Sequence, residues 1–179
     1  MRLKQTLKYS PNFDLKKRSK NKIRFLVFHY TGMKSDTKAL NKHSIGIEVS
    51  NPGHQYNYKD FSKKQIRSII NLSKYLIKKY NINYKNILGH SDIAPIRKKD
   101  PGEKFPWSIL AKNKIGVWHS LPNLILKNNR LIKTDHKDNN YFVKNLLKIG
   151  YTFKNSKGLK KNLFLKLLIK AFQEDIDKN

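Results

Sequence analysis

The chain has 179 residues, of which 38% are hydrophobic, and this length suffices for one core of moderate size with a small additional unit. It has no cysteine, which excludes disulfides and thiolate metal ligands, so a zinc ion would have to be held by His, Asp or Glu side chains. The formal net charge of +27 favours anionic partners, but only six of the 39 basic residues are arginine and no nucleic-acid recognition pattern is present, so we expect a lysine-rich solvated surface and no specific nucleic-acid site.

Apolar runs alternate with amphipathic stretches in the first half of the chain, which predicts strands alternating with helices and hence an α/β layer architecture. The clearest helix begins at the N-cap Ser62, after which isoleucine and leucine recur at helical spacing. Pro95 and Pro101 exclude regular structure from the segment after the last strand. In chain order, the expected elements are a strand at 22–30, a short helix at 35–42, a strand at 43–50, a helix from Ser62 to about Lys79 and a strand at 84–90.

Three polar side chains lie at or near the carboxyl ends of these strands, where sites gather in open α/β sheets. His29 and His90 end the first and third strands, Glu48 lies near the end of the second, and Asp100 follows on a loop that prolines stiffen. Two histidines and an aspartate form a chemically sound ligand set for a catalytic zinc that keeps one position for water. A lone histidine at the end of a strand is more often a hydrogen-bonded structural residue, so spacing alone leaves both interpretations open.

The segments FLVFHYTGM, SIGIEVSNPGH and LGHSDIAPIRKKDPGEKFPW resemble the signature segments of the zinc-dependent N-acetylmuramoyl-L-alanine amidases of the type 2 amidase family, which share the peptidoglycan-recognition-protein fold. The resemblance covers about residues 9–118. It implies a small mixed sheet with flanking helices, bound Zn²⁺, and hydrolysis of the amide bond between N-acetylmuramic acid and L-alanine in peptidoglycan or muropeptide fragments. Matched residue by residue, it implies zinc ligands at His29, His90 and Asp100, an acid/base role for Glu48 and oxyanion stabilisation by Lys98.

Glu48 and Lys98 each have a simpler interpretation when the resemblance is set aside. Glu48 could be a surface carboxylate on a strand whose apolar residues face the other way. Lys98 lies in the basic run from Arg97 to Lys99, and such a run is usually a solvated charge cluster. The remaining histidines are interpreted as surface residues: His43, His54, His119 and His136.

The sequence departs from the family pattern between Lys42 and His43. Family members have several dozen further residues there, including two strands and a loop that walls the substrate groove, so an internal deletion is our hypothesis. Residues 31–42 still supply the roughly one dozen residues that a parallel crossover needs, so a sheet with fewer strands could close. Zinc binding is expected to survive more readily than catalysis, because a misplacement of about 1 Å can cost about 10²-fold in rate. The alternative function is a catalytically degenerate relative that binds peptidoglycan or muropeptides without cleaving them.

The composition becomes polar and turn-rich after the amidase-like segment. The expected organisation is an amidase-like domain at 1–118, a linker at 119–139 and a small helical unit at 140–179, similar to part of a peptidoglycan-binding module. A plain helical cap on the first domain is the alternative, and a unit of fewer than about 40 residues is expected to lean on that domain. The apolar positions that could pack together are Phe142, Leu146, Leu147, Ile149, Leu163, Leu167, Leu168, Ala171 and Phe172.

The first residues are basic but lack the apolar core of a signal peptide, and no run of about 18 apolar residues is present, so no membrane span is expected. As encoded, the chain is therefore expected in the cytoplasm, with soluble anhydro-muropeptides as substrate. A start upstream of Met1 would instead allow work in the periplasm or cell wall. The sequence indicates no particular oligomeric state.

Overall fold

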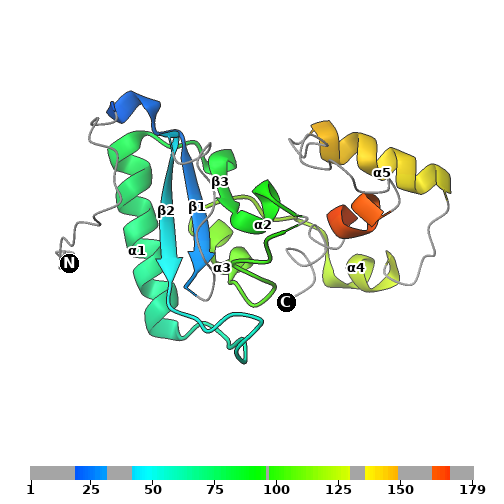
Figure 1. Cartoon of the computed structure of the whole chain (residues 1–179), viewed down its shortest axis with the longest axis horizontal. Helices are drawn as coiled ribbons and strands as arrows, with labels where there is room; N and C mark the ends of the chain where they lie inside the picture. The colour runs from blue at the N-terminus through cyan, green and yellow to red at the C-terminus, as the bar shows by residue number, and fades with distance from the viewer. Residues whose placement is uncertain (1–18, 32–41, 96, 130–135, 149–162, 170–179) are drawn as a thin grey trace.

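The computed structural model describes residues 19–31, 42–95, 97–129, 136–148 and 163–169 of the chain (Figure 1). In chain order the elements are η1 (Lys20–Lys22), β1 (Phe25–Tyr30), β2 (Ser44–Val49), α1 (Lys63–Tyr80), η3 (Tyr84–Asn86), β3 (Ile87–Gly89), α2 (His90–Ile93), α3 (Trp107–Lys112), α4 (Asn123–Asn129) and α5 (His136–Lys148). A further helical stretch covers residues 163–169. Figure 1 shows the strands and α1 at one end of the molecule, with α4 and α5 at the other.

The described strands form one parallel sheet in the order β2–β1–β3. β1 pairs along its whole length with β2, from Phe25 opposite Ser44 to Tyr30 opposite Val49. The α/β class predicted from the sequence is confirmed, although the described strands are all parallel where a mixed sheet was expected. Since β1 and β2 are direct parallel neighbours, the dozen residues that join them do serve as the crossover connection.

Helix α1 covers one face of the sheet because its apolar stripe meets the strand residues that alternate toward it. Leu26 and Phe28 of β1 lie in the same buried cluster as Ile69 and Leu76 of α1. The side chains at the intervening positions of β1 and β2 point to the opposite face of the sheet. That opposite face carries His29, so α1 supports the site from behind.

The start of α1 is the feature that the sequence predicted best. Ser62 Oγ accepts a hydrogen bond from Gln65 N at 3.3 Å, and Ser62 N donates to Gln65 Oε1 at 2.9 Å, which makes a reciprocal capping box. The helix ends at Tyr80, close to the predicted end, and the left-handed conformation of Asn81 (φ 52°) terminates it.

The third strand is shorter than predicted. β3 covers only Ile87–Gly89, because a 3-10 turn whose N-cap is Asn83 precedes it. His90 does not end the strand and instead begins α2, a helix of four residues that the neighbouring prolines had argued against. Residues 35–41 of the predicted short helix lie outside the described residues.

The two helical patterns after residue 139 do pack together, as predicted. Leu146 of α5 forms a buried cluster with Phe164 and Leu168, and Phe142 packs against it. The buried residue at the start of the second helical pattern was predicted one position too early. Leu163, which was expected in the cluster, is 49% exposed, while Phe164 is 1% exposed. The segment predicted as a linker contains α4, and α5 begins in it at its first residue, His136; Ile149, Ala171 and Phe172 lie outside the described residues.

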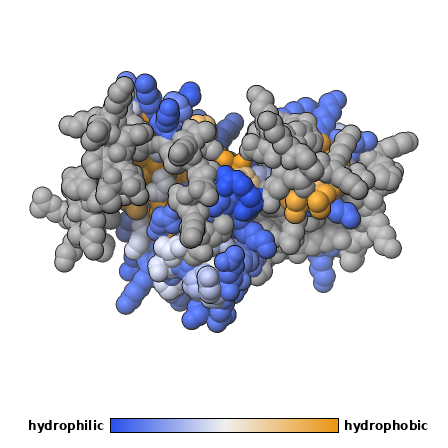
Figure 2. All heavy atoms as spheres, viewed as in Figure 1, coloured by the Kyte–Doolittle hydropathy of each residue, from blue (hydrophilic) through white to orange (hydrophobic). Residues whose placement is uncertain are grey.

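The visible surface is mainly hydrophilic where residues are coloured, with smaller apolar areas between (Figure 2). This agrees with the lysine-rich solvated surface expected from the composition. Among the helices that the structure describes, none is long and apolar enough to cross a membrane.

Candidate metal centre

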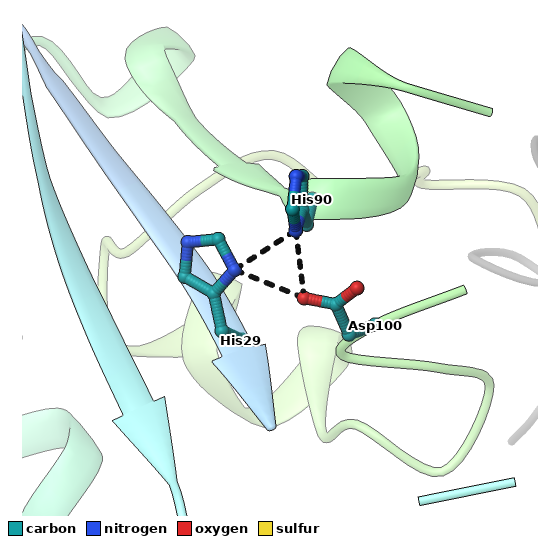
Figure 3. Close-up of side chains that lie close together, drawn as sticks. All are labelled: His29, His90 and Asp100. Atoms are coloured by element: carbon teal, nitrogen blue, oxygen red, sulfur yellow. Dashed lines mark hydrogen bonds and ion pairs between the residues drawn. The ribbon is translucent and has the colours of Figure 1, made fainter. Parts of the chain in front are cut away.

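His29, His90 and Asp100 come from three different parts of the fold and point toward one another (Figure 3). His29 is the penultimate residue of β1, and His90 is the first residue of α2, directly after the neighbouring strand β3. Asp100 lies in the loop that precedes α3. Because β1 and β3 are adjacent and parallel, their carboxyl ends bring the two imidazoles together at one edge of the sheet.

The three ligand atoms form a nearly equilateral triangle. Asp100 Oδ2 lies 2.9 Å from His29 Nδ1 and 3.0 Å from His90 Nδ1, and the two Nδ1 atoms are 3.0 Å apart. In the neutral state the two imidazole rings carry one N–H hydrogen each, which is too few for three hydrogen bonds. If both Nδ1 atoms donate to the carboxylate, no hydrogen lies between the two nitrogens. A cation at the centre would satisfy all three lone pairs, and ligand atoms about 2.0–2.1 Å from a tetrahedral zinc lie about 3.3 Å apart, close to these distances.

Burial and charge both favour a cation at this place. His90 and Asp100 are buried, whereas the His29 side chain is 17% exposed. Burial alone would raise the pKa of Asp100, but hydrogen bonds with His29 and His90 outweigh it and lower the pKa to about 2. The carboxylate is therefore ionised at neutral pH. Among the described residues, its second oxygen Oδ1 has no hydrogen-bond partner.

Glu48 lies directly opposite His29 in the register of β1 and β2 and shares its face of the sheet. Its side chain is exposed, with the buried Ile47 and Val49 turned the other way. Partial desolvation raises the pKa of Glu48; the charges of His29, His90 and Lys98 act to lower it and that of Asp100 to raise it further. Glu48 thus lies within electrostatic reach of all three clustered side chains.

Lys98 differs from its neighbours in the basic run. Lys98 is buried, with 7% of its surface exposed, while Arg97 and Lys99 are exposed. Its backbone N–H donates to Ala94 O at 3.0 Å, which tightens the turn after α2. The solvated cluster that the charge run alone would suggest therefore describes Arg97 and Lys99 but not Lys98, whose charge acts on Glu48.

The part of the sequence that runs from just before β2 to the loop before α3 matches a known family. Residues 37–103 match the family model of N-acetylmuramoyl-L-alanine amidase. This match includes Glu48, His90, Lys98 and Asp100, and the structure adds His29 from outside it. The resemblance stated from the sequence motifs is thereby confirmed.

Two curated relatives are similar to parts of this chain. N-acetylmuramoyl-L-alanine amidase AmiD of Escherichia coli is 45% identical over 84 residues, which are 44% of this chain and 30% of the relative. The 1,6-anhydro-N-acetylmuramyl-L-alanine amidase AmpD of Enterobacter cloacae is 40% identical over 68 residues, 38% of this chain and 34% of the relative. The chain thus spans about a third of the length of the curated relatives it matches.

Solved amidase structures share the fold over most of the chain. E. coli AmiD in complex with anhydro-N-acetylmuramic acid-L-Ala-D-gamma-Glu-L-Lys gives a TM-score of 0.70 at 25% identity, covering 87% of this chain and 80% of that one. AmpDh3 of Pseudomonas aeruginosa, in complex with anhydromuramic pentapeptide, gives 0.67 at 22% identity, covering 96% and 89%. The amidase fold predicted from the sequence is confirmed by these likenesses.

Two glycines of the amidase segment have roles that the sequence did not reveal. A Cβ on Gly46 would lie 3.4 Å from Cδ2 and Nε2 of His29, so a larger side chain there would press on the imidazole. A Cβ on Gly89 would lie 2.7 Å from Pro101 Cδ, which is closer than packed atoms allow. Gly89 N also donates to Asp92 Oδ2 at 2.7 Å, which fixes the start of α2 at His90.

Sequence reasoning also missed a group of side chains around His54. Instead of facing solvent, the His54 imidazole lies 2.9 Å from Tyr30 Oη and 2.8 Å from Glu103 Oε2, and it stacks on Tyr58. The Asn-Pro-Gly-His turn was the available signal, because its glycine has φ +75° and allows close contact with the Tyr30 ring. His119, also expected at the surface, is partly buried. The side chain of His136 is not among those that the structure describes.

Proposed function

We propose that this chain is a zinc-dependent hydrolase that cleaves the amide bond between N-acetylmuramic acid and L-alanine in muropeptides or peptidoglycan. The observation that carries the proposal is the convergence of His29, His90 and Asp100 on one point, with ligand atoms 2.9–3.0 Å apart, two of them from the segment that matches the amidase family. Because this chain matches only part of the length of its relatives, the amidase activity of those proteins is a proposal for this chain.

Zinc is the metal that this donor set favours. Two imidazole nitrogens and one carboxylate oxygen, with no thiolate in the chain, suit a catalytic zinc that keeps a fourth position open. When bound, zinc supplies a Lewis acid that polarises a carbonyl and activates water near neutral pH. The chain supplies the orientation, since His90 and Asp100 are buried, and the His29 side chain is 17% exposed to solvent.

Glu48 is proposed to move the proton during hydrolysis. Attack of water on the carbonyl carbon forms a carbon–oxygen bond and releases a proton, which the Glu48 carboxylate can accept. The same proton then passes to the nitrogen of L-alanine as the carbon–nitrogen bond breaks, so that the products are a free lactyl carboxyl group and a free amine. Desolvation raises the pKa of Glu48, which brings it closer to the range that suits a general base and acid.

Lys98 is proposed to stabilise the oxyanion that develops on the carbonyl oxygen. It is buried and its charge is felt at Glu48, so it lies near the reacting groups with little water to screen it. A fixed positive charge at such a place lowers the energy of the transition state without reorganisation.

The names of the similar proteins support a proposal for the substrate class. The AmiD structure holds anhydro-N-acetylmuramic acid-L-Ala-D-gamma-Glu-L-Lys, and AmpD is named for 1,6-anhydro-N-acetylmuramyl-L-alanine. We propose a muropeptide of this kind as the substrate of this chain. Intact peptidoglycan, which contains the same amide bond, is the larger alternative substrate.

A second candidate is binding of muropeptides without cleavage. The exposure of Gly46 and Glu48 on β2 favours it, because an exposed base is poorly shielded from water. In this candidate, the metal ligands and the fold persist while the precise positioning needed for turnover is absent.

One assay separates the two candidates. The purified chain would be incubated with zinc and anhydro-N-acetylmuramic acid-L-Ala-D-gamma-Glu-L-Lys, and the release of a peptide with a free alanine amine would be followed by mass spectrometry. Released peptide supports the hydrolase, and saturable binding without product supports the second candidate. His90→Ala is expected to abolish both product and stoichiometric zinc, with His43→Ala as the matched control; full zinc content in His90→Ala would defeat the ligand assignment.

A further inference from the structure

Four side chains outside the metal ligands connect the end of β1 with the loop that carries Asp100. We name this group the loop clasp: Tyr30, His54, Tyr58 and Glu103. Tyr30 is the last residue of β1, and Glu103 is the third residue after Asp100. His54 and Tyr58 come from the segment between β2 and α1 and lie between the other two.

The first half of the clasp is a chain of hydrogen bonds through His54. Its Nε2 lies 2.8 Å from Glu103 Oε2, and because a carboxylate only accepts, Nε2 donates this bond. Its Nδ1 lies 2.9 Å from Tyr30 Oη. The pair of His54 and Glu103 is only about a quarter exposed, at 24% and 23% of the two side chains. The strand end and the ligand loop are therefore joined through one imidazole.

The second half of the clasp is the hydroxyl group of Tyr58. It donates to the carbonyl oxygen of Pro101 at 2.7 Å and accepts from the backbone N–H of Lys104 at 3.1 Å. Burial raises the pKa of Tyr58 above its usual range, so the hydroxyl keeps the proton that it donates. The Tyr58 ring stacks on His54 with centroids 4.4 Å apart and planes inclined by 26°. The two halves thus support each other.

Gly102 shows how closely the loop lies against these rings. Its φ is +84°, and a Cβ there would lie 2.6 Å from Tyr58 Oη and 2.8 Å from His54 Cε1. No side chain fits in that space, so the backbone of the ligand loop packs directly on the clasp. This contact is two residues away from Asp100.

Asp100 depends on its backbone for its orientation. Its Oδ2 contacts His29 and His90, and among the described residues its Oδ1 has no partner, so no other side chain aims the carboxylate. On one side, Ser91 N donates to Asp100 O at 2.8 Å and ties the loop to α2. On the other side, the clasp holds the loop where it leaves Asp100, and further along the chain the buried ring of Phe105 and a hydrogen bond from Lys104 Nζ to Tyr58 O at 2.9 Å anchor it.

We propose that His54 and Tyr58 are positioning residues that fix Asp100 as a metal ligand, acting through Glu103 and Pro101. The inference rests on the proposed metal-dependent function, and it assigns to the clasp the strength of metal binding rather than any contact with substrate. Groups that orient a ligand from outside the metal's own coordination commonly change metal affinity by about 10–100-fold.

Tyr58→Phe is the sharpest test, since it removes one hydroxyl and keeps the stacked ring. We expect zinc affinity, measured by competition with a chelating dye, to fall about 10-fold. In the cobalt-substituted protein, the visible absorption spectrum should change as Asp100 loosens its hold. Tyr56→Phe is the matched control, because Tyr56 is 67% exposed in the same segment and should leave both measurements unchanged.

Glu103 provides a second, independent pair of variants. Glu103→Ala should also weaken zinc binding, whereas Glu103→Gln should restore most of it, because the amide oxygen still accepts from His54 Nε2. Thermal unfolding in excess chelator would show whether the variants remain folded. If the clasp had a merely structural role, the variants would have a lower melting temperature. Their cobalt spectrum and zinc affinity, measured well below the melting temperature, would be unaltered.

The outcomes distinguish this inference from the function on which it rests. If the wild-type chain binds one zinc and folded Tyr58→Phe and Glu103→Ala bind it equally well, the positioning role is overturned and the metal centre stands. If the wild-type chain binds no zinc, both the metal centre and the inference fail. The clasp is supported if Tyr58→Phe and Glu103→Ala bind zinc more weakly and have a changed cobalt spectrum, while Tyr56→Phe and Glu103→Gln bind zinc about as well as the wild-type chain.

Discussion

His29 on β1 and Glu48 on β2 are direct partners in the parallel register, so the strand pairing itself places the proposed proton carrier beside a proposed metal ligand. Glu48→Gln keeps the size of the side chain but removes its basicity. We expect the rate of muropeptide hydrolysis to fall by about 10²–10⁴-fold while zinc content stays at one ion per chain. Asp60→Asn, at an 87% exposed carboxylate side chain, is the control. Loss of zinc together with activity in Glu48→Gln would contradict the assignment.

Lys98→Met tests the oxyanion role. Methionine retains much of the apolar stem but carries no charge, so the transition state should lose stabilisation while the ground state is bound nearly as before. We expect the turnover number to fall by about 10²–10³-fold with a much smaller change in the Michaelis constant. The neighbouring exposed Lys99→Met should have little effect. Equal losses in the two variants would show that general positive charge, and not Lys98, is what matters.

Gly46 offers a graded test of how β2 supports His29. A Cβ at this position would lie 3.4 Å from the imidazole, an ordinary contact, but the further carbons of valine would press on the ring. Gly46→Ala should therefore keep near-normal zinc affinity, whereas Gly46→Val should weaken it. Isothermal titration with zinc measures both. Equal affinity in the two variants would mean that the position of the His29 ring does not depend on the absence of a side chain at Gly46.

The metal-free protein should lose stability in acid through Asp100. The pKa of Asp100 is lowered from 3.8 to about 2 in the folded chain, so the ionised group stabilises the fold above about pH 4 and this contribution disappears as the pH falls through 2. The shift corresponds to about 2 kcal/mol. Denaturant unfolding of wild type and Asp100→Asn in chelator, followed from pH 5 downward, should show their free energies of unfolding converging. A constant difference over that range would refute the linkage.

Local patterns were enough to predict the elements whose stability is local. The cap at Ser62, the apolar stripe of α1 and the apolar run of β1 are each decided by neighbours within a few residues, and each is present in the structure. The third strand was predicted too long because its first part makes a 3-10 turn, in which Asn83 Oδ1 accepts from Lys85 N at 2.9 Å. Nothing in the apolar pattern distinguishes these two outcomes.

The parts of the site that sequence reasoning missed depend on contacts between distant segments. His54 and Glu103 are 49 residues apart, so no local pattern links them, and Gly46 matters only because β2 pairs with the strand that carries His29. Lys98 was singled out only through the family resemblance, because the charge pattern of Arg97, Lys98 and Lys99 does not show which of the three is buried. Lys98 is buried because of the turn after α2, and this turn was not predicted because Pro95 and Pro101 argued against regular structure there.

The spacing of the three ligands has a consequence for how the protein holds together. His90 and Asp100 are 10 residues apart, but His29 is 61 residues from His90. An ion gripped by all three would cross-link the ends of that long loop, much as a disulfide does in proteins that have cysteine. In this cysteine-free chain, part of the resistance to unfolding would then come from a reversible cross-link that a chelator removes. The melting temperature should therefore rise with the concentration of free zinc.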